Sequence, residues 1–166
     1  LFLMPTPVPF VFSDEERTLA VEEGMRRQRV NEARGLRGRN KGVWKGDKAL
    51  EIHLLGAAGE VAVASYLGLK RHLFKEKEAK RGSDDLPGID VKTRSKASYD
   101  LIVQKNENPE KKFVLVTIEN QQTLIHGWCY GREALQDCFW ADPARGRPAY
   151  FVPKEALHSI DTLFVE

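Results

Sequence analysis

The sequence predicts a mixed α/β or α+β fold, in which a mixed β-sheet is flanked by helices. Three observations predict it: a capping motif opens a polar helix near the N-terminus, a second and mostly apolar segment has helical periodicity, and short β-like runs separated by turn residues make up most of the rest. A buried helix against one sheet is the simplest arrangement of such elements. With 166 residues, 42% hydrophobic and 30% charged, the chain is typical of a globular protein and not of a disordered one.

The N-terminal segment begins with LFLMPTPVPFVF, an apolar run that contains three prolines. No basic stretch precedes it, so it makes a poor signal peptide, and no apolar run approaches the roughly 18 residues that span a bilayer. We expect a docking arm, or in part an upstream read-through with Met4 as the true start. The next residues, Ser13-Asp-Glu-Glu16, form a capping box that predicts a helix from about Asp14 to about Ala33.

A second helix is predicted from about Ala49 to Leu67. Apolar residues recur there at helical spacing around most of the circumference, so the helix should be largely buried. Gly56 and Gly59 lower its helix propensity, which indicates that another part of the chain comes close at these positions.

Glu60 is the only acidic residue in the stretch 52–67 of this apolar helix. Burying a lone carboxylate is costly unless the group is paired or binds a metal ion. Glu60 is therefore a candidate site residue. The alternatives are a position at a solvent-facing edge, or a structural ion pair with Lys92.

The remaining segments favour strands separated by turns. We predict strands at Arg71–Lys75, Gly82–Leu86, Ile89–Thr93, Asp100–Gln104, Phe113–Glu119, Gln122–Cys129 and Ala149–Val152. A short helix is predicted over Arg132–Cys138, and a turn or helix from Lys154. Cys129 and Cys138 fit no metal-binding spacing, so we expect reduced and mostly buried thiols in a cytosolic protein.

Basic residues are concentrated between Arg26 and Lys48, where nine Lys and Arg occur with two acidic residues, although the formal net charge is only +2. Local positive charge is typical of a protein that binds a polyanion, and a solvated helix face is the alternative. The glycines of the stretch RGLRGRNKGVWKGDK predict a mobile connector, and a mobile basic loop can close over a phosphate backbone. Its candidate nucleic-acid contacts are Arg34, Arg37, Arg39, Lys41 and Lys45.

Three charged side chains surround a tight turn in the stretch GSDDLPGIDVKTRS. Pro87-Gly88 fits the central pair of a type II turn, which would place Asp85 opposite Asp90 on one face of a hairpin. Lys92 would share that face because side chains alternate along a strand, and the rival Asp84 would lie on the other face. Two carboxylates so close repel each other, so a divalent ion should complement Lys92, and oxygen ligands favour Mg²⁺ or Mn²⁺.

The stretches GAAGEVAVASYLGL and DLPGIDVKT resemble the PD-(D/E)XK nuclease superfamily, in which a helix glutamate precedes an Asp…(Asp/Glu)-x-Lys motif. The downstream sequence, from YDLIVQKNENPEKKFVLVTIENQQTLIHGWCYGREAL to PAYFVPKEAL, is similar to small phage-encoded members, and the resemblance covers about residues 49–157. It implies a restriction-endonuclease-like core over residues 49–166, preceded by an N-terminal arm, helix and basic loop over residues 1–48. Two departures are that Asp84, not proline, precedes Asp85, and that the spacing from Asp85 to Asp90 is short.

The resemblance implies a Mg²⁺- or Mn²⁺-dependent DNA endonuclease that acts in the cytoplasm, of the host if the gene belongs to a phage, without a membrane. The implied catalytic residues are Glu60, Asp85, Asp90 and Lys92. The implied metal ligands are Asp85, Asp90, the Val91 carbonyl and, directly or through water, Glu60. Lys92 would orient or deprotonate the attacking water, because a lysine pKa shifts readily on burial.

Further residues near the motif have weaker implied roles. Arg94 and Lys96 would contact the DNA backbone, and Gln104 would position water or phosphate. A homodimer is left open, since double-strand cleavage often needs two sites. Two other readings also stay open: a non-catalytic nucleic-acid-binding module that keeps the nuclease fold, and an interaction or structural protein whose Asp-x-Lys turn is only a salt-bridged turn.

Overall fold

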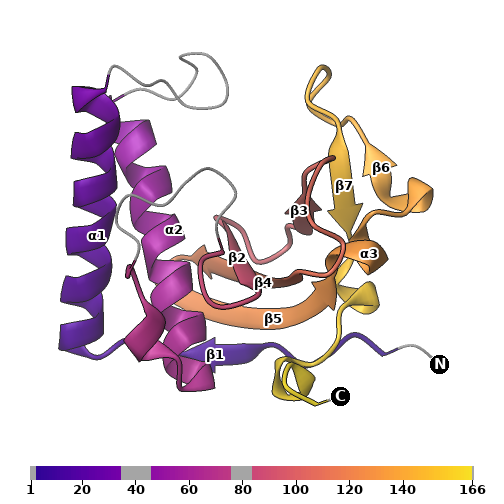
Figure 1. Ribbon diagram of the computed structural model, residues 1–166, viewed down its shortest axis with the longest axis horizontal. Coiled ribbons are helices and arrows are strands. Elements are labelled where there is room, and N and C mark those ends of the chain that lie inside the picture. The colour runs from indigo at the N-terminus through magenta and orange to yellow at the C-terminus, as the bar shows by residue number, and fades with distance from the viewer. Residues whose placement is uncertain (1–2, 35–45, 76–83, 166) are drawn as a thin grey trace.

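The computed structural model describes residues 3–34, 46–75 and 84–165 (Figure 1). Within them the helices are α1 (Asp14–Ala33), α2 (Gly46–Leu67) and α3 (Gly131–Ala134), with the 3-10 helices η1 (Lys70–His72), η2 (Asp137–Phe139), η3 (Lys154–Ala156) and η4 (Ile160–Thr162). The strands are β1 (Val8–Phe10), β2 (Ile89–Arg94), β3 (Leu101–Val103), β4 (Lys112–Glu119), β5 (Gln122–Tyr130), β6 (Trp140–Ala141) and β7 (Ala149–Val152).

The strands form two sheets, and the two long helices pack on the larger one. This sheet has the order β1-β5-β4-β2, with β2 parallel to β4 and the other pairs antiparallel. The smaller sheet, β3-β7-β6, is antiparallel. The mixed α+β class is therefore confirmed, whereas the prediction of one single sheet is wrong.

The core explains why a second sheet is needed. Strand β4 is apolar on both faces: Val114 and Val116 pack with Val63 and Ala64 of α2, while Phe113 and Leu115 pack in a separate cluster that includes residues of β3 and β7. Successive side chains of a strand point to opposite faces. A strand that is apolar on both faces must be covered on both sides, here by α2 and by the smaller sheet.

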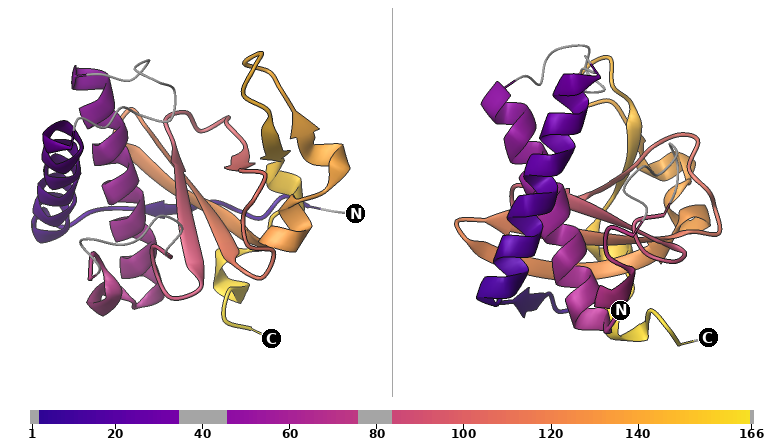
Figure 2. Two further views of the ribbon diagram at one scale, coloured as in Figure 1. Left: turned by 45° about the horizontal axis from the view of Figure 1, so that its top comes forward. Right: turned by 60° about the vertical axis from the view of Figure 1, so that its left-hand side comes forward.

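Helix α1 begins where the capping box predicts. The Ser13 side chain accepts a hydrogen bond from the Glu16 backbone N–H, and the Glu16 carboxylate accepts one from the Ser13 N–H. Figure 2 shows that α2 lies between α1 and the sheet. A side chain at Gly24 would meet the Leu54 backbone, so this glycine lets α1 pack closely on α2.

The close approach that we predicted at the α2 glycines is confirmed at Gly59. A Cβ atom built there would lie 1.8 Å from Thr93 Oγ1 on β2, so only glycine fits without a shift. Gly56 has more room, with the Arg27 guanidinium 3.7 Å away. The contact at Gly59 brings the following residue, Glu60, to the edge of the sheet that β2 forms.

The N-terminal arm is an edge strand of the larger sheet. β1 pairs with β5, with Pro9 opposite Leu124. Proline lacks a backbone N–H and is tolerated in edge strands, which suits this position. Together with the α1–α2 packing, β1 ties the first part of the chain to the core.

One predicted strand is not a strand, and neither is the described part of a second. Arg71–Lys75 folds into η1 and a turn, with Phe74 at a positive φ of 55°. In Gly82–Leu86, residues 82 and 83 lie outside the described residues, and Leu86 makes only an isolated bridge to Ile89. The predicted helix Arg132–Cys138 is divided into α3 and η2, since Leu135 leaves the helical region.

Two other features bear on the predictions. In the part of the chain that the structure describes, the segment Asp47–Leu67 of α2 is long and apolar enough to cross a membrane, a property that it shares with buried core helices. Both cysteines are free thiols, but only Cys129 is buried, and Cys138 is exposed.

Candidate metal centre

The Pro87-Gly88 turn forms as predicted. Leu86 and Ile89 exchange two backbone hydrogen bonds, of 3.0 and 2.9 Å, and Gly88 has a φ of +71°. A positive φ at the third position is what a type II turn requires, and glycine adopts it without strain. The turn joins a single residue pair, however, and not the two long strands of a hairpin.

Side-chain carboxylates continue the pairing beyond the turn. The Val91 N–H donates to Asp85 Oδ2 at 2.9 Å, and the Asp85 N–H donates to Asp90 Oδ1 at 3.2 Å. Each aspartate thus takes the place of a backbone carbonyl, and the two carboxylates are held beside each other. The ladder partner of β2 is instead the parallel strand β4.

Strand β2 separates its apolar side chains from its charged ones. Ile89 and Val91 belong to the cluster that packs on α2, and Thr93 faces Gly59. Asp90 and Lys92 point to the opposite face, where Lys92 Nζ lies 5.6 Å from the centre of the Phe113 ring. This arrangement agrees with the prediction that Asp90 and Lys92 lie on the same face of the strand.

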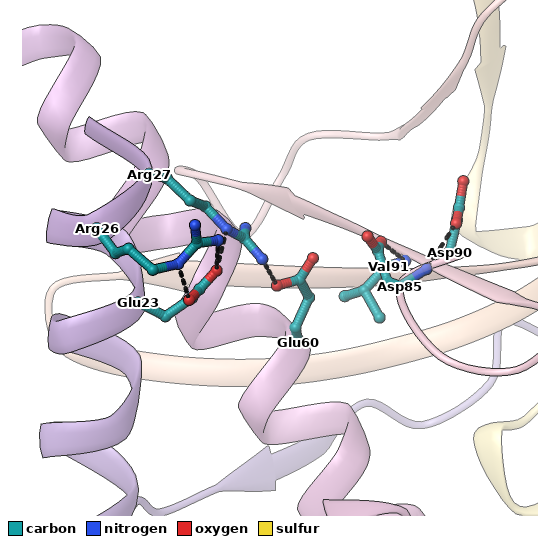
Figure 3. A network of polar contacts seen from close by, with 7 residues as sticks. All are labelled: Glu23, Arg26, Arg27, Glu60, Asp85, Asp90 and Val91. Carbon is teal, nitrogen blue, oxygen red and sulfur yellow. Dashed lines mark hydrogen bonds and ion pairs between the residues drawn. The ribbon is translucent and has the colours of Figure 1, made fainter. Parts of the chain in front are cut away.

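Glu60 is buried, with a positively charged neighbour on one side and a negatively charged neighbour on the other (Figure 3). Arg27 of α1 donates from Nη2 to Glu60 Oε2 at 2.6 Å, and Asp85 lies on the other side. Burial, the negative charge of Asp85 and a hydrogen bond with it raise the pKa of Glu60 to about 8, against the effect of Arg27. In the part of the chain that the structure describes, Glu60 therefore pairs with Arg27, not with Lys92, and it is not at an exposed edge.

Asp90 is also short of positive charge. Burial first, and then the charge of Asp85, raise the pKa of Asp90, although Lys92 and Lys111 act in the opposite direction. Lys111 Nζ lies 3.2 Å from Asp90 Oδ2 and 3.0 Å from Asp84 Oδ1. Asp84 thus shares a cation with Asp90, and the prediction that it lies on the opposite face, away from the cluster, is wrong.

Lys92 has an acidic neighbour that the sequence pattern did not indicate. Its Nζ lies 3.7 Å from Glu107 Oε1, in the loop between β3 and β4. The ammonium is half-buried over the Phe113 ring. Lys92 is therefore close enough to Asp90 to lower its pKa, but is held partly toward Glu107.

The donor set fits a hard divalent ion bound by few protein ligands. Within the described ranges, no three His, Cys, Asp or Glu side chains converge closely enough to hold a metal ion by themselves. Mg²⁺ needs only one or two carboxylates, because water and phosphate oxygens complete its shell. Asp85 and Asp90 supply that pair, with Glu60 beside Asp85, while a role for the Val91 carbonyl stays a prediction.

The predicted DNA contacts are in part outside the described residues, namely Arg37, Arg39, Lys41 and Lys45. Arg34 is exposed at the end of α1, and Lys96 and Gln104 are exposed as well. Arg94 instead donates to the Asp100 carbonyl at 2.8 Å and stacks on Tyr99, so it holds the loop after β2.

Two cations of the site, the half-buried Arg27 and the buried Lys111, were not predicted as site residues. Arg27 was assigned to the basic DNA-binding segment, yet it binds Glu23 and Glu60. The i, i+4 spacing of Glu23 and Arg27 signals the first contact, since such residues are neighbours on a helix. Lys111 is one of two adjacent lysines, and no local pattern distinguishes it from Lys112.

Comparisons with known proteins add no family. No protein-family model matches this chain, and no curated protein and no solved structure is significantly similar to it.

Proposed function

We propose that this protein is a metal-dependent DNA endonuclease with a restriction-endonuclease-like core. The observation that carries the proposal is the local excess of carboxylates at Glu60, Asp85 and Asp90. These side chains come from α2, the residue before the Pro-Gly turn and β2, and Asp85 lies between Glu60 and Asp90 at the edge of the sheet (Figure 3). Lys92 follows on the same strand face as Asp90.

The charge balance supports an additional cation. Glu60 keeps a pKa of about 8 although a guanidinium lies 2.6 Å away, and the pKa of Asp90 is raised although two lysines are near. Buried like charges destabilise a fold unless something compensates them. A divalent ion on the Asp85 and Asp90 oxygens would compensate the excess of negative charge around both Glu60 and Asp90.

The residues of the site have distinct roles in this proposal. Asp85 and Asp90 would hold the ion, and Glu60 would hold it directly or through water. A bound Mg²⁺ would lower the pKa of a water molecule and neutralise charge that develops on phosphate oxygens. Lys92 would orient or deprotonate the attacking water and stabilise the negative transition state. The exposed Arg34 and Lys96 bind the phosphate backbone without reading its sequence.

The test is a cleavage panel on linear, supercoiled, single-stranded and junction DNA, with Mg²⁺, Mn²⁺ or EDTA. We expect cleavage with either metal ion and none with EDTA. Asp90→Asn should lower cleavage by more than about 100-fold. Changing a residue that only hydrogen-bonds to a metal ligand already costs about 10- to 100-fold, and Asp90 is proposed as a direct ligand. Lys92→Ala should act similarly.

The control for Lys92→Ala is Lys105→Ala, which changes an exposed lysine after β3. It should cleave like the wild type. Equal cleavage by the wild type and Asp90→Asn would overturn the mechanism, and cleavage that persists in EDTA would overturn the metal dependence.

A second candidate is a non-catalytic nucleic-acid-binding module of the same fold. It is favoured by two cations, the half-buried Arg27 and the buried Lys111, which already neutralise part of the acidic cluster without a metal ion. This candidate predicts DNA binding that is unaffected by EDTA and no cleavage in any metal. A homodimer and a cytoplasmic location stay predictions.

A further inference from the structure

Lys111 is a buried lysine whose side chain reaches the candidate metal centre. Only 6% of the residue is exposed. Its backbone is fixed on both sides: its N–H donates to the Asn108 carbonyl at 3.2 Å, and its carbonyl accepts from the Gly131 N–H at 2.7 Å. A residue so anchored presents its ammonium group in a defined place.

The adjacent lysine takes another direction. Lys112 donates to the Leu163 carbonyl and lies over the rings of Trp128 and Tyr130, away from the acidic cluster. The pair of lysines is thus divided between two environments. Lys112 therefore provides a matched control for Lys111.

The two carboxylate oxygens of Asp90 have different partners. Oδ1 accepts from the Asp85 N–H, on the side of Asp85 and Glu60. Oδ2 faces Lys111 Nζ, which also contacts Asp84. Asp90 therefore separates two positions for a cation, and an ammonium group fills one of them at hydrogen-bonding distance from both aspartates.

From this arrangement we propose that Lys111 is a built-in cation that limits the centre to a single divalent ion on the Asp85 side of Asp90. The proposal rests on the proposed function, because it takes Asp85 and Asp90 as metal ligands. Lys111 is a positioning residue: it holds Asp90 by Oδ2 so that Oδ1 stays directed toward Asp85. A second divalent ion between Asp84 and Asp90 would need the same space and would be repelled by the ammonium group.

Removal of Lys111 should change the number of ions that bind. In Lys111→Met, Asp84 and Asp90 Oδ2 lose their common cation and are left as two neighbouring carboxylates. Such a pair gains most from a new divalent ion. Methionine keeps the length and apolar body of the lysine stem, so packing changes little.

The experiment is Mn²⁺ binding, measured by isothermal titration calorimetry and by the electron paramagnetic resonance signal of free Mn²⁺. We expect one ion per chain in the wild type and in Lys112→Met, and two in Lys111→Met. One ion in both the wild type and Lys111→Met would overturn the role of Lys111 and leave the proposed function intact. Two ions in the wild type would also overturn it. No bound ion in the wild type would overturn the proposed metal centre, and this inference with it.

A measurement on the unaltered protein covers the case in which Lys111→Met does not fold. Anomalous scattering from Mn²⁺-soaked crystals locates the ion directly. We expect Mn²⁺ between Asp85 and Asp90, with Lys111 Nζ still in contact with Asp84 and Asp90. An ion in place of the ammonium group, between Asp84 and Asp90, would overturn the proposal.

Discussion

The two sides of Arg27 differ in charge balance although both are buried. On the α1 side lies Glu23, and on the α2 side lies Glu60, each with 6% of the residue exposed. Both accept hydrogen bonds from the same guanidinium, at 2.9 and 2.6 Å. The shared arginine therefore cannot explain a difference between them.

The carboxyl groups nevertheless behave in opposite ways. Although burial acts against it, hydrogen bonds from Arg26 and Arg27 lower the pKa of Glu23. Burial and the charge of Asp85 raise the pKa of Glu60 to about 8. The difference comes from the deeper burial of the Glu60 carboxyl group and from the second neighbour, an arginine beside Glu23 and an aspartate beside Glu60. The missing positive charge is thus confined to the side of the turn, where the metal ion is proposed.

The strongest test of this comparison replaces each glutamate by glutamine in metal-free protein at pH 7. Glu23→Gln should lower the free energy of unfolding by about 3 kcal/mol, because a buried ion pair loses one partner and the amide turns a donor toward guanidinium groups. Glu60→Gln should cost less than about 1 kcal/mol, since a carboxyl group with a pKa of about 8 is already mostly neutral at pH 7. Urea denaturation in EDTA measures both, and equal losses would contradict the comparison.

The packing that brings Glu60 to the turn can be broken at Gly59. Gly59→Ala should destabilise the protein by about 2 kcal/mol, because the new methyl group overlaps Thr93 Oγ1 and forces α2 and β2 apart. The matched control is Gly56→Ala, where the nearest atom outside the helix lies 3.7 Å away. That variant should be neutral or more stable by up to about 1 kcal/mol, because alanine favours helix. Thermal denaturation distinguishes them, and the same shift in both would exclude the close contact.

His126 is a buried titratable group that shares a hydrogen bond with a neutral side chain. Its Nε2 lies 2.7 Å from Thr117 Oγ1, and burial, with the charge of Lys154, lowers the pKa of His126 to about 4. The folded state thus keeps the ring neutral, so its contribution to stability is present above pH 6.5 and is lost as the pH falls toward 4. Between pH 7 and 5 the wild type should lose about 1–2 kcal/mol more than His126→Gln. Urea titrations at both pH values measure this, and parallel losses would contradict it.

The smallest expected effect concerns the exposed basic residue at the end of α1. Arg34→Ala should weaken DNA binding about three-fold and reduce the slope of log K against log salt by about 1, as for the loss of one phosphate contact. Arg17→Ala is the control, since Arg17 is exposed near the start of the same helix, beside Asp14. Fluorescence anisotropy at several salt concentrations measures both variants. Unchanged binding by Arg34→Ala would remove this residue from the DNA surface.

Local patterns predicted the elements whose causes are local. The capping box gave the start of α1, the apolar periodicity gave α2, and the strand Ala149–Val152 has the predicted bounds. The Pro-Gly turn and the proximity of Asp85 and Asp90 also follow from backbone geometry over six residues. The strand prediction for Arg71–Lys75 is wrong, because strand propensity depends on the surrounding structure. This segment folds into η1 and a turn with a positive φ at Phe74.

The sequence by itself determined the acidic turn, the lone glutamate in an apolar helix and the alternation that puts Asp90 and Lys92 on one face, because each depends on residues a few positions apart. Only the tertiary structure decided which cations reach these acids. Arg27 is 33 residues from Glu60, and Lys111 is 21 residues from Asp90. Their positions depend on how α1 packs on α2 and how β4 lies beside β2. No periodic pattern in the sequence indicates which distant acidic residue a lysine or arginine will contact.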